Sequence, residues 1–305
     1  MSDIIKLNNQ IVLKPFGLIN VGNTCWFNSL IQCLLSCTSF TETIIQNYDI
    51  FVNNNNIIAI EFYKLIKNSY NTQNIYNPIN LLKAFIKTMQ NKQFNIRDIH
   101  RIQGDPNEGF LKLIECIDNE DIETLFQIRY QTYIKCGNCN HKTKPKIEHA
   151  LHIEYFDYHK LSQNNNNFTK NILYKIQKLN DYTCDKCHQK NNNTTYVHKL
   201  LRVPNVFPIL FNKYYGVNPV NFPENIDIIY NDNIHFMNFK LVSTAIHNGS
   251  LNGGHYYACG IRHNNDCNEN NFYVLNDSGF SPNNDVWQKN KPHTYFAFYH
   301  YNGLK

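Results

Sequence analysis

The feature that most constrains this chain is the stretch of residues 17–32, in which a glycine-containing loop leads into a helix-forming segment. Apolar residues recur after Cys25 at positions i, i+3, i+4 and i+7, which predicts a helix with one buried face. These residues are Phe27, Leu30, Ile31 and Leu34. Cys25 then lies in the first turn, where unpaired N–H groups and the positive end of the helix dipole favour a thiolate. The pattern predicts that Cys25 is a nucleophile.

A lone cysteine at a helix start can also be a small buried apolar residue, but the rest of this motif favours chemistry. The side-chain amide of Asn20, in the loop before the helix, can donate to an oxyanion that forms beside the sulfur. The string GLINVGNTCWFNSLIQCLL resembles the cysteine motif of the ubiquitin-specific protease family. Members of that family are papain-like cysteine proteases that remove ubiquitin, so the resemblance implies a catalytic Cys25.

Length and composition indicate a large folded domain. The chain has 305 residues, of which 42% are apolar and 14% aromatic, so it can bury a substantial core as one domain or two lobes. No run reaches the roughly 18 apolar residues of a membrane helix, and the N-terminal residues have no secretory signal pattern. The net charge of +5 comes with scattered lysines, which gives weak support for nucleic-acid binding. We expect a monomer of the cytoplasm or nucleus, without membrane or nucleic-acid partners.

Residues 41–100 are predicted to be mainly helical, and a further apolar helix follows Pro106. Asp105 and Glu108 lie three positions apart at the start of that helix, where carboxylates commonly cap the N-terminus. The family resemblance implies another role, since its members have acids here that bind the basic C-terminal tail of ubiquitin. Gly109 departs from the family, which has a bulky apolar residue after the glutamate.

Alternating and aromatic residues predict strands over 120–135, 147–156 and 196–215. Between them lie two CxxC pairs, Cys136 with Cys139 and Cys184 with Cys187, which supply four thiolates for a tetrahedral zinc ion. The alternative is a pair of redox motifs or buried thiols. In the resembled family, this spacing marks a structural zinc site at the tip of the fingers subdomain.

His255 follows two glycines at the start of an aromatic, strand-like run. A cysteine protease needs such an imidazole to accept the thiol proton and later protonate the leaving amine. Most of the 13 histidines are expected to be surface or core residues, but the string around His255 resembles the histidine motif of the family. That motif includes His247, which we interpret as a supporting residue.

Asn276 and Asp277 end a second apolar strand, over residues 272–275, and are followed by Ser278. An Asn-Asp-Ser string by itself is typical of a turn. By family position, Asn276 is the acceptor that orients the histidine, and Asp277 is an auxiliary polar neighbour. A final sheet strand is predicted over 294–301.

The resemblance runs from about residue 14 to 301 and implies an α+β, papain-like fold. A single catalytic domain would span residues 14–302, after a short N-terminal extension at 1–13. Within it we expect a helical thumb at about 14–120, zinc-bearing β fingers at about 121–200 and a β-sheet palm at about 201–302.

The implied activity is thiol-dependent hydrolysis of the isopeptide or peptide bond after the C-terminal glycine of ubiquitin. Ubiquitin and ubiquitinated proteins would be the partners, and Zn²⁺ would be a structural cofactor. Two alternatives stay open: a ubiquitin-binding module without catalysis, and an enzyme acting on another ubiquitin-like protein.

Overall fold

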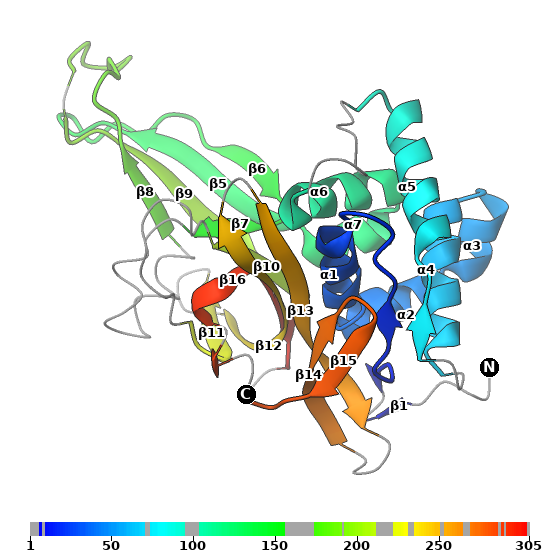
Figure 1. Cartoon of the computed structure of the whole chain (residues 1–305). Coiled ribbons are helices and arrows are strands. Elements are labelled where there is room, and N and C mark those ends of the chain that lie inside the picture. Colours follow the sequence, from blue (N-terminus) through cyan, green and yellow to red (C-terminus); the bar gives the residue numbers. More distant parts are fainter. Residues whose placement is uncertain are drawn as a thin grey trace.

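The structure is a computed structural model in which helices and strands gather on opposite sides of an α+β fold (Figure 1). It describes residues 6–7, 10–70, 74–94, 104–155, 174–190, 192–211, 222–230, 235–250, 253–264, 269–285, 288–289 and 291–303. Within these ranges, no helix is long and apolar enough to cross a membrane.

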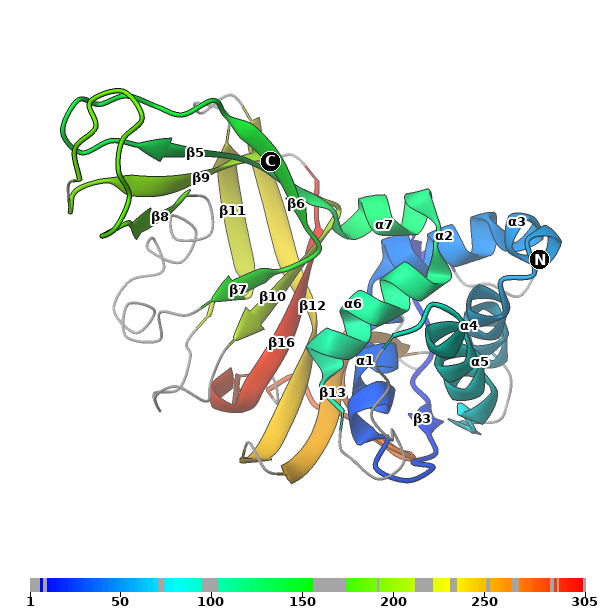
Figure 2. The ribbon, with the colours of Figure 1, turned by 90° about the horizontal axis from the view of Figure 1, so that it is seen from above.

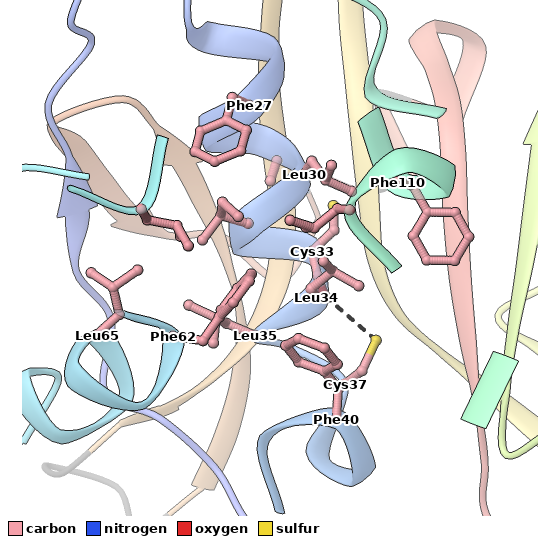
Figure 3. Packing of buried hydrophobic residues seen from close by; sticks show 14 of the residues in the cluster. Phe27, Leu30, Cys33, Leu34, Leu35, Cys37, Phe40, Phe62, Leu65 and Phe110 are labelled. Atoms are coloured by element: carbon pink, nitrogen blue, oxygen red, sulfur yellow. Dashed lines mark hydrogen bonds between the residues drawn. The ribbon is translucent and has the colours of Figure 1, made fainter. Parts of the chain in front are cut away.

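Helices α1 to α7 lie in the first half of the chain and pack around one core. Their bounds are Cys25–Leu34 (α1), Thr38–Gln46 (α2), Tyr48–Asn53 (α3), Ile57–Asn68 (α4), Ile79–Asn91 (α5), Pro106–Ile117 (α6) and Glu120–Phe126 (α7). Figure 3 shows side chains of α1 between Phe62 and Leu65 of α4 on one side and Phe110 of α6 on the other. The helices predicted over residues 41–100 and after Pro106 are therefore confirmed where the structure describes them, with their apolar stripes in this core, while residues 71–73 and 95–100 lie outside the described residues.

The larger sheet, called the palm sheet below, has eight strands within the described part of the chain. Their bounds are Ile153–Tyr155 (β7), Val206–Phe211 (β10), Asn225–Tyr230 (β11), His235–Ser250 (β12), Gly253–Asn264 (β13), Glu269–Asn276 (β14), Gly279–Pro282 (β15) and Thr294–Tyr301 (β16). Their order is β15-β14-β13-β12-β16-β10-β7, and β11 also pairs with β12. The strand predicted over 294–301 is β16. Because β13 and β14 are neighbours, the sheet brings the segments that carry His255 and Asn276 side by side.

A four-stranded sheet, called the fingers sheet below, extends away from the helices (Figure 2). Its strands are Ile128–Lys135 (β5), Lys146–Ala150 (β6), Tyr174–Lys178 (β8) and Thr195–Arg202 (β9), in the order β6-β5-β9-β8. The strand predicted over 147–156 is divided between the two sheets, because the chain bends at residues 151 and 152. As a result β6 pairs with β5, while β7 pairs in parallel with β10. Residue 156 lies outside the described residues.

Two short pairs complete the strands of the described residues: β1 (Lys6–Leu7) with β2 (Gln10–Ile11), and β3 (Gly17–Leu18) in parallel with β4 (Ile75–Tyr76). Strand β3 directly precedes the loop that carries Asn20. It also lies against β14 and β15 of the palm sheet. The N-terminal segment therefore joins the helices to the sheet close to the predicted site.

Helix α1 is buried on all sides, whereas the sequence predicted one buried face. The difference arises because α6 covers one side of α1 and strands β12, β13 and β14 cover another (Figure 1). Its polar side chains are buried with hydrogen bonds inside the protein: Asn28 donates to the carbonyl of Leu18 at 3.3 Å, and Gln32 donates to that of Phe16 at 2.8 Å. Internal partners thus replace the solvent that a half-exposed helix would have.

The strand predicted over 120–135 is wrong in its first half, which forms α7 before β5 begins. The side chain of Asn119 accepts a hydrogen bond from the backbone N–H of Ile122 at 3.0 Å and so caps the helix. Acidic residues in the first turn also favour a helix N-terminus; they are Glu120, Asp121 and Glu123. The strand predicted over 196–215 is likewise two strands, β9 and β10, and residues 212–215 lie outside the described part of the chain.

Candidate functional site

Cys25 is the first residue of α1, and it is 5% exposed. Thr24 occupies the cap position but makes no side-chain hydrogen bond to the first turn. The cap therefore leaves the first N–H groups of α1 to other acceptors, and such groups together with the helix dipole attract an anion. The thiol thus lies where negative charge is electrostatically favoured.

The carboxylate of Asp277 joins the loop before α1 to the helix itself. Asn20 Nδ2 donates to Asp277 Oδ2 at 3.0 Å, and Asn28 Nδ2 donates to Asp277 Oδ1 at 2.8 Å. On its other side, Asn20 Oδ1 accepts from the backbone N–H groups of Gly22 at 3.0 Å and Thr24 at 3.2 Å. Because an amide nitrogen carries two hydrogens, Asn20 keeps a second N–H beyond the one that Asp277 binds.

Asp277 reaches these partners from a tight turn between β14 and β15. Its φ is 47°, in the left-handed region that Asp tolerates better than most residues. The carbonyl of Asp277 accepts a hydrogen bond from the N–H of Leu18 at 2.7 Å. A Cβ on Gly17 would lie 2.3 Å from the carbonyl oxygen of Ser278, so the close approach of β3 to this turn requires glycine.

His255 and Asn276 form a hydrogen-bonded pair on neighbouring strands. His255 Nε2 and Asn276 Oδ1 are 2.7 Å apart. An amide oxygen only accepts, so Nε2 carries the hydrogen and the neutral ring has its lone pair on Nδ1. A half-buried imidazole held in this tautomer can accept a proton from a thiol through Nδ1.

Strand β13, which carries His255, packs directly on α1, which begins with Cys25. The backbone before His255 is held by close packing, since a Cβ on Gly254 would lie 2.5 Å from His247 Nε2. The His247 ring is buried and stacks on Tyr256, with ring centroids 4.3 Å apart. His247 therefore contacts both neighbours of His255 and restrains its backbone.

The two predicted tail-binding acids lie at the start of α6. Asp105 is the N-cap: its Oδ1 accepts from the N–H groups of Asn107 at 2.7 Å and Glu108 at 3.0 Å, and its Oδ2 accepts from the Tyr295 hydroxyl. These contacts are the ones that the capping alternative describes. The side chain of Glu108 is 65% exposed and pairs with Lys112 at 2.6 Å. Asp105 thus fixes the helix start, whereas Glu108 faces solvent.

The glycine that departs from the resembled family has a steric explanation in the indole of Trp26. A Cβ on Gly109 would lie 2.4 Å from Trp26 Cζ3, and a Cβ on Gly104 would lie 2.4 Å from Trp26 Cε2. The bulky ring thus fills the space that side chains at both positions would need. The residue after Cys25 thereby determines how closely the start of α6 approaches α1.

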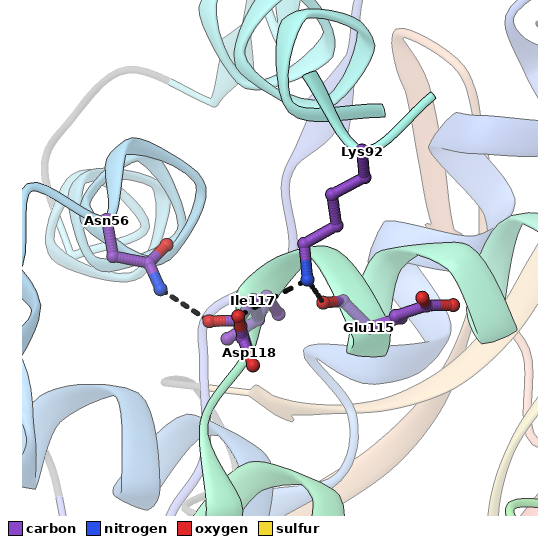
Figure 4. A network of polar contacts seen from close by, with 5 residues as sticks. All are labelled: Asn56, Lys92, Glu115, Ile117 and Asp118. Carbon is purple, nitrogen blue, oxygen red and sulfur yellow. Dashed lines mark hydrogen bonds and ion pairs between the residues drawn. The ribbon is translucent and has the colours of Figure 1, made fainter. Parts of the chain in front are cut away.

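The C-terminal end of α6 is held by a polar network (Figure 4). Lys92 Nζ donates to the carbonyl of Glu115 at 2.8 Å and pairs with Asp118 at 3.3 Å. Asn56 Nδ2 donates to the carbonyl of Ile117 at 2.5 Å. These contacts satisfy carbonyl groups that a helix end leaves unpaired, so α6 is fixed at both ends.

The fingers sheet ends in two cysteine knuckles of matching geometry. The sulfur atoms of Cys136, Cys139, Cys184 and Cys187 all lie within 4.8 Å of one another. Two of their separations are 3.7 and 3.8 Å, which match the edge of about 3.8 Å of a tetrahedron with Zn–S bonds of about 2.3 Å. The residue after each knuckle is left-handed, with φ of 57° at Asn140 and 55° at His188. This donor set fits a zinc ion.

Solved structures of other proteins share the fold of this chain. A chain of the SAGA DUB module (Ubp8/Sgf11/Sus1/Sgf73) bound to monoubiquitin is 20% identical, with a TM-score of 0.74 over 95% of this chain and 70% of that one. The module bound to ubiquitin aldehyde gives the same values. The α+β arrangement of the helices, the palm sheet and the fingers sheet is therefore the fold of these solved structures.

The sequence comparisons name the family. The sequence model of the family described as ubiquitin carboxyl-terminal hydrolase matches residues 16–299, and this chain belongs to that family. Ubiquitin carboxyl-terminal hydrolases 17 and 26 of Arabidopsis thaliana are similar to it, with 26% and 24% identity over 72% and 80% of the chain. The chain spans only 32% and 24% of the lengths of these two relatives.

Sequence reasoning missed several residues that shape the site. Asn28 binds Asp277, Tyr295 binds Asp105, and the buried Arg262 donates to Gln32 of α1. Asn28 had a local signal, because it is a polar residue one turn after Cys25 and lies between the apolar residues Phe27 and Leu30. Tyr295 had none, since its partner lies 190 positions away.

Proposed function

We propose that this chain is a deubiquitinating thiol hydrolase that cleaves the isopeptide or peptide bond after the C-terminal glycine of ubiquitin. The observation that carries the proposal is the His255–Asn276 pair, 2.7 Å apart, on strands that pack against the helix of Cys25. Family membership supports it. So does the likeness to the SAGA DUB module bound to monoubiquitin and to ubiquitin aldehyde.

In the first half of the reaction, Cys25 attacks the carbonyl carbon of the terminal glycine. His255 takes the thiol proton at Nδ1, and the imidazolium stays oriented by Asn276. The oxyanion accepts hydrogen bonds from the second N–H of Asn20 and from N–H groups at the start of α1. Collapse of this intermediate breaks the C–N bond, and His255 returns the proton to the departing lysine amine.

In the second half, water hydrolyses the thioester that links Cys25 to ubiquitin. His255 accepts a proton from the water as it attacks, and the same N–H groups stabilise the second oxyanion. The thiolate leaves and is reprotonated by His255. Ubiquitin departs with a free C-terminal carboxyl group, which releases its proton to solvent, and the enzyme regains its starting state.

Substrate binding would use the start of α6 and the fingers. Glu108 would attract the basic tail of ubiquitin. The carboxylate of Asp105 would add to this attraction while it caps α6. The four fingers cysteines would hold a structural zinc ion, and a shell of four thiolates leaves no position for a reacting water. Ubiquitin and ubiquitinated proteins are the proposed partners.

Hydrolysis of ubiquitin–rhodamine tests this proposal and separates it from its two alternatives. We expect the full chain to release rhodamine, and to cleave at least one linkage in a panel of di-ubiquitins. A ubiquitin-binding module would bind ubiquitin without releasing rhodamine. An enzyme for another ubiquitin-like protein would prefer the rhodamine amide of that protein by kcat/KM.

A further inference from the structure

Arg262 is a fully buried cation on β13, the strand that also carries His255. Its Nη1 donates to Ser36 Oγ at 2.5 Å and to the carbonyl of Ile261 at 2.8 Å. Its Nη2 donates to Gln32 Oε1 at 2.5 Å and to the Gln32 carbonyl at 3.1 Å. Among the described residues, no carboxylate pairs with it. Burial lowers the pKa of Arg262 to about 10, so the guanidinium is charged at neutral pH.

The surroundings of this cation are polar but neutral. Cys33 and Cys37 lie close, but burial raises the pKa of the Cys33 thiol to about 12 and raises the pKa of the Cys37 thiol well above its ordinary value. The guanidinium instead faces the C-terminal carbonyl groups of α1, the negative end of the helix dipole, and lies 5.9 Å from the Phe16 ring centroid. Burying a cation without a carboxylate partner is costly, and even buried ion pairs can often be replaced by apolar residues without loss of stability, so stability alone is a weak reason for a cation here.

The contacts of Arg262 extend to a third segment through Gln32. While Gln32 Oε1 accepts from Arg262, Gln32 Nε2 donates to the carbonyl of Phe16 at 2.8 Å. The chain from Phe16 continues through β3 to Asn20. One guanidinium therefore links the strand of His255, the helix of Cys25 and the segment that leads to Asn20.

Close backbone packing lets these three segments share one cation. A Cβ on Gly260 would lie 2.2 Å from Ser36 Oγ, so glycine allows β13 to approach the end of α1. The Ser36 hydroxyl in turn donates to the Gln32 carbonyl at 2.9 Å. The guanidinium of Arg262 fits this arrangement because its N–H donors lie in one rigid plane, a geometry that a lysine ammonium cannot reproduce.

We propose that Arg262 is a positioning residue that holds α1, β13 and residues 16–20 in the register that brings Cys25, His255 and Asn20 together. This inference rests on the proposed function. Arg262 acts on the far end of α1 from Cys25, and small displacements of that helix translate into misplacement of the sulfur. A shift of about 1 Å at a reacting atom can lower turnover by about a hundredfold.

The test compares wild type with Arg262→Lys, which keeps the positive charge but lacks the planar set of N–H donors. We expect kcat on ubiquitin–rhodamine to fall by about tenfold to a hundredfold with KM within about twofold of wild type. Ubiquitin binding, measured by calorimetry with Cys25→Ala and with Cys25→Ala/Arg262→Lys, should be unchanged. Phe62→Leu is the matched control, because it loosens the helical core from α4 and leaves the hydrogen bonds of Arg262 in place.

The two variants are compared at temperatures equally far below their melting points. The proposal would be overturned if Arg262→Lys and Phe62→Leu had equal kcat. It would also be overturned if Arg262→Lys raised KM and left kcat unchanged. If Arg262→Lys does not fold, Ser36→Ala replaces it, because this variant removes one acceptor of the guanidinium. We again expect kcat to fall while KM stays close to that of wild type. Wild-type turnover is measured first. Its absence would overturn the proposed function, whereas wild-type activity with unaffected variants would overturn only the role of Arg262.

Discussion

The carboxylate of Asp277 lies 3.0 Å from the side-chain amide of Asn20, although the two residues are 257 positions apart. The same carboxylate binds Asn28 on α1 at 2.8 Å. Asp277 thus connects the turn after Asn276 with the loop before Cys25. One carboxylate orients the amide that is proposed to stabilise the oxyanion and holds it in place relative to the helix.

Replacing Asp277 by Ala should therefore slow chemistry more than it weakens binding. Loss of the carboxylate frees the Asn20 amide to turn, and oxyanion donors contribute about a hundredfold to a thousandfold to kcat. We expect a fall in kcat of at least about tenfold, with KM nearly unchanged. Asp285→Ala, at an exposed position after β15, is the control and should retain wild-type kcat. A rise in KM alone would contradict this role.

The two acids of α6 should respond differently to substitution. Asp105→Ala removes the N-cap and should lower the free energy of unfolding by about 0.5–2 kcal/mol, which chemical denaturation measures. Glu108→Lys should leave stability nearly unchanged, because its side chain is 65% exposed, but raise KM for ubiquitin–rhodamine by repelling the basic tail. Lys112→Ala tests whether loss of the Glu108–Lys112 pair alone changes KM. An unchanged KM for Glu108→Lys would remove this residue from the proposed binding site.

Gly109→Ala should destabilise the protein because its Cβ would meet the Trp26 indole at 2.4 Å. Overpacking of this kind typically costs about 1–3 kcal/mol. In a Trp26→Leu background the ring is absent, so Gly109→Ala should cost much less, and a double-mutant cycle measures the difference. Gly279→Ala is the control, because its nearest contact would be Asn276 O at 3.4 Å. Equal costs of Gly109→Ala in both backgrounds would show that the indole does not set this position.

Cys184→Ser should remove zinc and weaken the capture of whole ubiquitin. Wild type should contain about one zinc per chain by elemental analysis, because four thiolates complete its shell. The variant should lose stability, since metal binding contributes to folding such tips, yet still cleave a short ubiquitin-tail peptide if wild type does. Cys116→Ser, a buried cysteine outside the cluster, should retain the metal. Zinc near zero in wild type would contradict the site, and equal loss on both substrates would contradict a role limited to capture.

Local sequence patterns predicted those elements that bury one face or one continuous run of residues in the core. Helix α4 buries one stripe against the core, so its spacing of Ile58, Phe62 and Leu65 was sufficient. Strand β16 coincides with the run 294–301 because its apolar residues are continuous. The pattern failed where capping decided the outcome, since the side chain of Asn119 starts a helix in a stretch that otherwise suggested a strand.

Contacts between distant segments lay beyond such patterns. The spacing around Cys25 predicted a helix, but not that Asn28 would be buried against Asp277, 249 positions away. Local patterns indicated Cys25 and the four zinc ligands, and the family resemblance singled out His255, Asn276 and the acids of α6, whereas the partners of these residues came from the structure. The Tyr295 hydroxyl on Asp105 is an example, because nothing near either residue in the chain indicates the contact.

The most direct measurement of the central claim is the reaction of the full chain with ubiquitin that carries a C-terminal electrophile. Intact mass spectrometry should show one ubiquitin added to wild type, and peptide mapping should locate the bond at Cys25. Cys25→Ala should form no adduct, while it still binds ubiquitin by calorimetry. An adduct at another cysteine, or no adduct from folded wild-type protein that binds ubiquitin, would contradict the assignment of Cys25 as the nucleophile.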